Sequence, residues 1–180
     1  MQRYNDLSSY LKEKFGSRLL KLSIDGGFSC PNRKNGKKGC KFCSESGSGE
    51  FTTKRKSITE QLNAQIKFLK DKDKYNGYIA YFQSYTNTFL PVEELRKMYY
   101  EAINFPNVKV LSIATRADCF NEEIYNLLEE LNEKIEVWIE LGLQSSNVYT
   151  RNSMNIGYST ETFENCVKRL KEINIKTIFH

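Results

Sequence analysis

The 180-residue sequence contains no apolar run near the roughly 20 residues that a membrane-spanning helix needs. Its mean hydropathy of -0.58 agrees, and we expect a soluble chain with no membrane partner. The first residues, MQRYNDLSSYLKEKF, lack the apolar run of a signal peptide, which predicts a cytoplasmic protein. The 39% hydrophobic and 27% charged residues are typical of a globular domain and exclude a disordered tail or a collagen.

Histidine is scarce, with a single residue, whereas cysteine occurs five times. An odd number of cysteines in a reducing compartment argues against a disulfide framework. The thiols therefore need another explanation.

Positive charge is concentrated in the first third of the chain. Residues 1–60 hold 13 Lys and Arg against 6 Asp and Glu, a net charge of +7, whereas residues 61–180 hold 14 against 16, a net charge of -2. A basic segment attracts a polyanion such as RNA. The alternative is that these lysines only solvate a surface loop, and the charge alone leaves both interpretations open.

Strand and helix patterns alternate along the chain. The expected strands are 20–24, 78–82, 108–114, 135–141 and 175–179, and the expected helices are 7–15, 58–69, 92–105, 121–131 and 160–173. The runs YIAYF, VLSIA and VWIEL are apolar on nearly every residue, as in strands buried on both faces. This order predicts an α/β architecture with parallel strands and right-handed crossovers, and periodicity cannot separate an open doubly wound sheet from a barrel.

The chain ends at His180, directly after the last apolar run and without a helix to cover it. We therefore expect a single domain over residues 1–180 that is truncated at its C-terminus.

Three of the five cysteines lie in segment 28–53, which is rich in Gly, Ser, Lys and Asn. Cys30, Cys40 and Cys43 are separated by nine and then two residues, and no fourth Cys or His is near them in the sequence. The short gap lets two thiolates face one ion or cluster, and the glycines between let the third fold alongside. A three-ligand zinc site and an iron-sulfur cluster with one exposed iron fit this pattern equally well.

Polar residues follow the later strands, at the end of a parallel sheet where active sites form. They are Gln83, Ser84, Tyr85, Thr86 and Asn87, then Thr115, Arg116 and Asp118, then Glu140 and Gln144. We expect them to converge opposite the cysteine loop and to form a cofactor pocket.

The segments GFSCPNRKNGKKGCKFCSESGSGEF, YFQSYTNTF, ATRADC and ELGLQS occur in this order. With them, the chain resembles the YtqA/YhcC-type radical S-adenosylmethionine (radical SAM) proteins, relatives of the elongator catalytic subunit, from about Tyr4 to His180. The resemblance implies a partial TIM-like (β/α)6 barrel with about five strands present, and a cluster-binding loop over 28–53. It also implies that Cys30, Cys40 and Cys43 ligate a 4Fe-4S cluster, whose fourth iron binds S-adenosylmethionine. An electron from the cluster then cleaves S-adenosylmethionine to a 5'-deoxyadenosyl radical.

The resemblance also implies roles for five side chains. Gln83 and Ser84 would lie near the methionine moiety, and Arg116 would meet its carboxylate or a substrate phosphate. Glu140 and Gln144 would lie near the ribose. The structural alternatives are that Arg116 pairs with Asp118 and that Glu140 caps a loop. No catalytic side chain is assigned.

Kinship with elongator suggests a tRNA base, a wobble-uridine side chain, as the substrate, and an electron donor such as flavodoxin or ferredoxin. Tyr85, Phe89 or Tyr149 would stack on an extruded base. Basic residues around the cysteines would contact phosphates: Arg33, Lys34, Lys37, Lys38, Lys41, Lys54, Arg55 and Lys56. The alternatives are a zinc-stabilised, non-catalytic nucleic-acid-binding module and a radical SAM enzyme that acts on a small molecule.

The chain departs from the family pattern at two places. It has Asn155, Ile156, Gly157 and Tyr158 where relatives commonly carry Asn-Arg-Gly-His, and an alanine in ATRADC where proline is usual. The first change removes a cation and an imidazole from the site, unless Arg151 substitutes. Of the two remaining cysteines, Cys119 is a packed thiol or a late hydrogen-atom donor, and Cys166 is structural.

Overall fold

The computed structural model describes residues 4, 6–44, 56–69 and 74–180. The strands are β1 (Leu20–Ile24), β2 (Tyr78–Phe82), β3 (Val108–Thr115), β4 (Glu136–Leu141) and β5 (Lys176–Phe179). The helices are α1 (Leu7–Phe15), α2 (Ile58–Lys67), α3 (Val92–Ile103), α4 (Glu122–Asn132), α5 (Val148–Ser153) and α6 (Thr160–Glu172), with a 3-10 helix at Pro31–Gly36. Among these described helices, none combines the length and the apolar character needed to cross a lipid bilayer.

Most of the described α-helices begin at a residue whose side chain caps them. Ser57 and Glu60 form a capping box at the start of α2, and Asn121 accepts a hydrogen bond from the Ile124 amide at the start of α4. Helix α1 ends at Gly16, whose φ of 70° is readily adopted by glycine. The predicted elements are confirmed to within two residues, but α5 and the 3-10 helix were not predicted, because neither carries a full apolar period.

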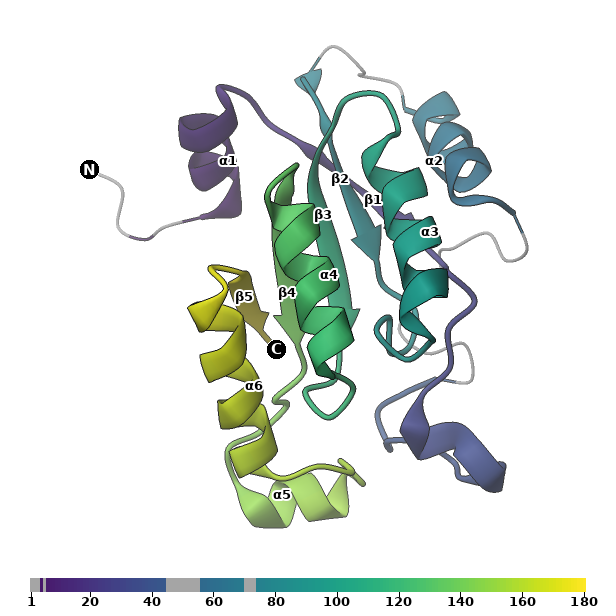
Figure 1. The fold of residues 1–180 in the computed structure, drawn as a ribbon, viewed down its shortest axis with the longest axis vertical. Helices are drawn as coiled ribbons and strands as arrows, with labels where there is room; N and C mark the ends of the chain where they lie inside the picture. The colour runs from purple at the N-terminus through teal and green to yellow at the C-terminus, as the bar shows by residue number, and fades with distance from the viewer. Residues whose placement is uncertain (1–3, 5, 45–55, 70–73) are drawn as a thin grey trace.

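The sheet is parallel throughout and its strands follow chain order, β1-β2-β3-β4-β5. Because each crossover advances the chain by one strand in the same direction, right-handed crossovers place the connecting helices on one face. Figure 1 shows α3 and α4 in front of the sheet, with α2 and α6 at its two sides. A doubly wound sheet would instead reverse its strand order and carry helices on both faces. The fold is α/β and consistent with a partial TIM-like barrel, as predicted.

The two faces of the sheet have separate apolar cores. The larger core lies between the sheet and its helices and includes Phe82, Leu111 and Leu128. The smaller core lies on the opposite face, where Leu11 of α1 packs with Trp138. Helix α1 therefore covers part of the face that the other helices leave open, which we call the inner face.

The outer edge of β1 is hydrogen-bonded by glutamine side chains from α2. The Gln61 amide accepts from the Asp25 N–H and donates to the Asp25 carbonyl, both at 2.9 Å. Gln65 does the same for Ser23, at 2.9 and 2.7 Å. The two amides replace a neighbouring strand, so the edge that leads into the cysteine loop is satisfied.

Candidate functional site

The inner face of the sheet changes from apolar to polar along the strands. Ile79, Val110 and Trp138 on β2, β3 and β4 pack on α1. Two residues further along each strand, and so on the same face, are Tyr81, Ser112 and Glu140. The carboxyl half of the inner face is therefore a polar surface, although each run is largely apolar in the sequence.

Glu140 is the centre of this polar surface, with only 2% of its side chain exposed. Its carboxylate accepts hydrogen bonds from Lys21 at 2.7 Å and from Ser112, and His180 Nε2 lies 2.9 Å from it. Burial by itself raises the pKa of Glu140, but the bonds from Lys21 and Ser112 outweigh it and bring the pKa below its ordinary value. Lys21 also lies 3.5 Å from the centre of the Tyr81 ring. The carboxylate is thus ionised at neutral pH and faces a fixed cation.

A pocket of about 350 Å³ opens at the carboxyl ends of the strands, within the range typical of ligand sites. In Figure 1, the arrowheads of β2, β3 and β4 point toward the end of the molecule that carries α5 and the 3-10 helix. Six of the eight predicted site residues line this pocket: Cys30, Cys40, Cys43, Arg116, Glu140 and Gln144. The fold therefore brings the cysteine loop and the polar inner face to one cavity.

The three cysteines of the loop are free thiols that are each partly exposed. Cys30 directly precedes the 3-10 helix, and a turn places the Cys43 amide 3.1 Å from the Cys40 carbonyl. Arg33 donates to the carbonyls of Cys43 and Ser44, which holds the end of the loop. Burial raises the pKa of the Cys43 thiol, and the neighbouring Cys40 raises it further.

The arrangement of thiols bears on what they can hold. Among the described residues, no three His, Cys, Asp or Glu side chains converge closely enough to hold one metal ion. A single zinc ion needs such convergence, whereas a four-iron cluster binds each thiolate on a different iron. The three sulfur donors line one pocket, which fits a cluster that keeps one iron free for a ligand. His180 is far from the three cysteines in the sequence, but it also lines this pocket, where it contacts Glu140.

Arg116 lines the pocket but already has an acidic partner. Its guanidinium donates two hydrogen bonds to Asp118, at 2.9 and 2.8 Å, which is the pairing named as the structural alternative to a ligand contact. Burial lowers the pKa of Arg116, but Asp118 outweighs this and raises it overall. The guanidinium also lies 5.0 Å from the centre of the Tyr158 ring. A ligand carboxylate or phosphate at Arg116 would share it with Asp118.

Gln83 and Ser84 lie directly after β2 and are not among the pocket-lining side chains. Their predicted contact with a cofactor stays a prediction. Tyr85 and Thr86 do line the pocket, whereas Asn87 is fully buried and bonds the Ala114 carbonyl at 2.7 Å. The expected convergence of this polar segment is thus correct for two residues and wrong for Asn87, which joins the loop to β3.

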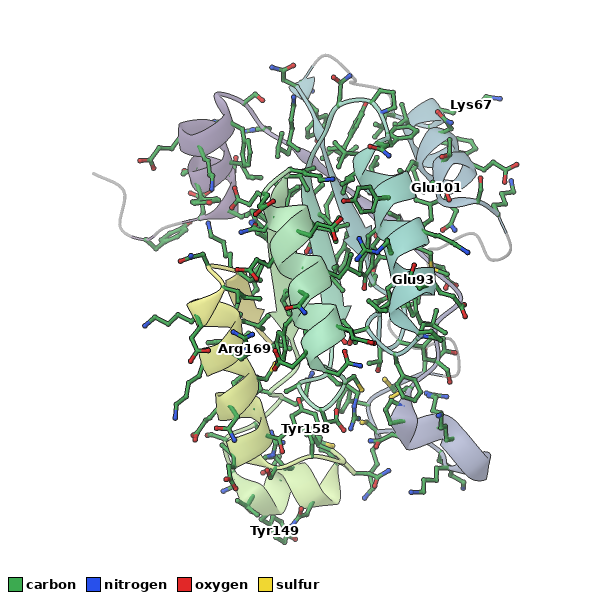
Figure 2. All side chains as sticks on the ribbon, in the orientation of Figure 1. Lys67, Glu93, Glu101, Tyr149, Tyr158 and Arg169 are labelled. Atoms are coloured by element: carbon green, nitrogen blue, oxygen red, sulfur yellow. The ribbon has the colours of Figure 1, made fainter. Side chains whose placement is uncertain are left out.

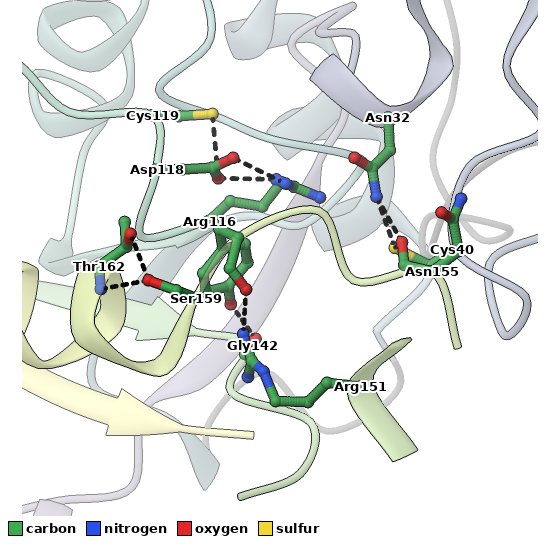
Figure 3. A network of polar contacts seen from close by, with 11 residues as sticks. Asn32, Cys40, Arg116, Asp118, Cys119, Gly142, Arg151, Asn155, Ser159 and Thr162 are labelled. Atoms are coloured by element: carbon green, nitrogen blue, oxygen red, sulfur yellow. Dashed lines mark hydrogen bonds and ion pairs between the residues drawn. The ribbon is translucent and has the colours of Figure 1, made fainter. Parts of the chain in front are cut away.

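A set of residues that sequence reasoning missed joins the cysteine loop to the segment after β4. The Asn155 side chain donates to the Gly39 carbonyl at 2.7 Å, and Asn32 donates to the Asn155 carbonyl at 2.8 Å and to the Cys40 sulfur at 3.2 Å (Figure 3). Asn155 has a φ of 58°, in the left-handed region that asparagine adopts more readily than most residues. The only signal in the sequence was this asparagine two residues before Gly157.

Arg151 does not replace the cation that the family pattern carries in this segment. It is 3% exposed and does not line the pocket of the cysteines. Its guanidinium donates to the carbonyls of Leu143, Ser145 and Tyr158, at 2.7, 3.3 and 2.6 Å. Arg151 therefore holds the loop after β4, and the condition under which it would substitute at the site is not met in this structure.

The candidate nucleic-acid contacts have different surroundings. Lys34, Lys37, Lys38, Lys41 and Lys56 are exposed, while Arg33 is partly buried in the pocket wall. Residues 54 and 55, like 45–53 of the predicted cluster-binding loop, lie outside the described residues.

The three predicted stacking side chains are also separated. Tyr85 lines the pocket, and Phe89 is partly buried with the Lys34 ammonium 4.5 Å from its ring centre. Tyr149 is 83% exposed and lies at the outer end of the molecule, on α5 (Figure 2). Cys119 and Cys166 are both buried, as packed thiols are.

Comparisons with known proteins agree with this geometry. Residues 29–180 match the Radical SAM superfamily. The chain is 38% identical to "Uncharacterized protein YtqA" of Bacillus subtilis over 99% of its own length and 56% of the relative. It is 35% identical to "Protein YhcC" of Escherichia coli over 94% of its length and 55% of the relative, and 34% identical to "Uncharacterized protein MJ0486" of Methanocaldococcus jannaschii over 95% and 53%. The chain thus spans about half the length of these relatives.

Proposed function

This chain belongs to the Radical SAM superfamily, and from that membership we propose that it is an enzyme that binds a 4Fe-4S cluster through Cys30, Cys40 and Cys43 and cleaves S-adenosylmethionine. The observation that carries the proposal is the sharing of one pocket by the three thiols and the polar inner face. Bound there, the cluster and S-adenosylmethionine supply reductive cleavage of a sulfonium bond and abstraction of a hydrogen atom from a substrate.

The protein's own contribution is to bind and orient these groups. In this proposal Gln83 and Ser84 contact the methionine moiety, and Arg116 binds its carboxylate or a substrate phosphate. Gln144 and Glu140 contact the ribose. Arg116, Glu140 and Gln144 line the partly buried pocket, which favours their contacts, because charged hydrogen bonds are stronger where water is excluded.

Glu140 is suited to accept hydroxyl hydrogen bonds because it is kept ionised. Lys21 and Ser112 hold its carboxylate in place, and a carboxylate has about four acceptor positions. Tyr81 and His180 also bond this carboxylate, so a ligand hydroxyl would share an oxygen with one of these four groups.

We extend the proposal to the substrate, a tRNA base such as a wobble uridine. Four exposed lysines beside the cysteines, Lys34, Lys37, Lys38 and Lys41, would neutralise backbone phosphates. Tyr85 in the pocket wall would stack on the extruded base. The reaction also needs electrons from a partner such as flavodoxin or ferredoxin.

The first test is anaerobic reconstitution of the protein with iron and sulfide. We expect a brown protein with broad visible absorption that cleaves S-adenosylmethionine, measured by liquid chromatography of the products. Cys30→Ala, Cys40→Ala and Cys43→Ala should each abolish cluster retention and cleavage. Cys166→Ala is the control, because that thiol is buried away from the pocket. Full cleavage by any of the first three variants contradicts the proposal.

The second test concerns the substrate. If the four lysines each neutralise one phosphate, affinity for tRNA should fall roughly 100-fold between about 50 and 200 mM salt. Salt-dependent tRNA binding by a colourless protein with one zinc per chain would support the nucleic-acid-binding module instead. Cleavage of S-adenosylmethionine without tRNA binding at low salt would point to a small-molecule substrate.

A further inference from the structure

We propose that Asn32 is a positioning residue whose side-chain amide donates a hydrogen bond to the sulfur of Cys40 and so raises the reduction potential of the bound cluster. This inference rests on the proposed function, because it requires the cluster at Cys40. It adds a residue outside the predicted ligands, and it gives the segment after β4 a part in electron transfer.

The orientation of the Asn32 amide is fixed by its second contact. The Asn32 nitrogen lies 2.8 Å from the backbone carbonyl oxygen of Asn155, which can only accept. The amide nitrogen must therefore face this side, and its other hydrogen is directed to the Cys40 sulfur at 3.2 Å (Figure 3). A thiol at Cys40 reaches the same carbonyl at 3.5 Å, but a thiolate has no proton to donate. When Cys40 is a ligand, the Asn32 amide serves both acceptors.

Two further contacts hold the amide at this place. Asn155 donates from its side chain to the Gly39 carbonyl at 2.7 Å, next to Cys40 in the chain. The Lys41 amide donates to the Met154 carbonyl at 3.1 Å. The two segments are thus joined on both sides of Cys40.

Gly157 provides the space that the Asn32 amide occupies. A Cβ atom at Gly157 would lie 2.4 Å from the Asn32 side-chain oxygen, well inside van der Waals contact. Gly157 has no positive φ that would require glycine for its backbone. Close approach to Asn32 is therefore the reason this position suits glycine, and a methyl group there would push the amide away from Cys40.

The expected effect follows from charge. Reduction adds an electron to the cluster, and a donor aimed at a ligating sulfur stabilises the more negative state. Loss of the donor makes the cluster harder to reduce. We expect the ratio of reduced to oxidised cluster at a fixed solution potential to fall about tenfold, which is about 59 mV for a one-electron couple.

The experiment is a redox titration of the reconstituted protein, followed by electron paramagnetic resonance. Asn32→Leu removes the donor at similar volume, and Asn32→Asp replaces it with a negative oxygen, so both midpoint potentials should be more negative than that of the wild type, with Asn32→Asp the lower. Asn152→Ala, at an exposed position on α5, is the matched control and should not shift the potential. Unchanged potentials in both Asn32 variants would overturn the inference, whereas a wild type that binds no cluster would instead refute the proposed function.

Two more variants separate a positioning role from loss of the fold. Gly157→Ala should lower the potential as Asn32→Leu does, and the double variant should show no further shift. Asn155→Gly keeps the backbone carbonyl and the positive φ but removes the bond to Gly39. It should lower the potential by less than Asn32→Leu does, because the Asn155 carbonyl that orients the amide remains. It should also speed trypsin cleavage of the apo protein at Lys37 or Lys38, which measures how firmly the loop is held. A Gly157→Ala potential equal to that of the wild type would contradict the inference.

Discussion

Replacement of Gln61 by leucine tests whether α2 supports the strand that leads into the cysteine loop. Gln61 is fully buried and satisfies both the N–H and the carbonyl of Asp25. It also donates to the Lys56 carbonyl at 3.0 Å. Leucine has a similar volume but no hydrogen-bonding group, so Gln61→Leu removes both of these bonds to the buried backbone of Asp25.

The cost can be worked from these contacts. Removing the hydrogen-bond partner of a buried backbone group costs about 1–3 kcal/mol, so the loss of the two bonds to Asp25 costs about 4 kcal/mol together. Burial of the leucine side chain returns roughly 2 kcal/mol. We therefore expect Gln61→Leu to lower the free energy of unfolding by about 2 kcal/mol, which lowers Tm by about 4–8 °C for a domain of this size.

The assay is urea unfolding with Gln65→Leu as the control. Gln65 makes the same pair of bonds to Ser23 but is only partly buried, so water can replace its amide. We expect Gln65→Leu to cost about 1 kcal/mol or less. Both variants should keep the wild-type m value, because the surface exposed on unfolding is the same. A loss for Gln61→Leu within about 0.5 kcal/mol of the Gln65→Leu loss would refute the reasoning.

Three further predictions concern charged side chains. Burial alone would raise the pKa of Glu136, but hydrogen bonds led by the one from Lys14 bring it to about 2, below the 4.5 of a free carboxyl. Glu136→Gln should therefore cost about 2 kcal/mol above pH 4.5, after allowance for solvent screening, and this difference should vanish as the pH falls from 4.5 to about 2. Urea unfolding across this range measures it, and a difference that does not change with pH would contradict it. Arg151→Lys should lower the free energy of unfolding by about 2–4 kcal/mol, because one ammonium group cannot bond all three carbonyls that the guanidinium bonds. Chemical denaturation measures this loss, and a loss under about 0.5 kcal/mol would contradict the prediction. Glu140→Gln should weaken the binding of S-adenosylmethionine several-fold, measured by calorimetry, because the neutral amide lacks the charge of the carboxylate that Lys21 faces. The iron content per chain should stay constant. Unchanged affinity would contradict the proposed contact of Glu140 with the cofactor.

The local elements of the fold could be predicted from the sequence because their causes are local. Ser57 with Glu60 marks the start of α2, and the bonds of that capping box span three residues. Apolar spacing marks the strands and the longer helices in the same way. α5 and the 3-10 helix escaped prediction because each is too short to show a period.

The cysteine pocket could be predicted in part. The spacing of Cys30, Cys40 and Cys43 and their place after β1 put them at the carboxyl end of the sheet. The polar inner face was hidden in runs that look apolar, because Glu140 is an isolated charge within VWIEL. Its partner Lys21 is 119 residues away, so no local pattern connects them.

The sequence by itself determined the elements, their order and the three-thiol motif, since these depend on side chains within a few residues of one another. Only the tertiary structure decided that the strands lie in chain order, with the connecting helices on one face and a polar surface on the other. It also decided that Asn155, 123 residues from Asn32, holds the cysteine loop. Such contacts depend on which strands become neighbours, and periodicity carries no information about that choice.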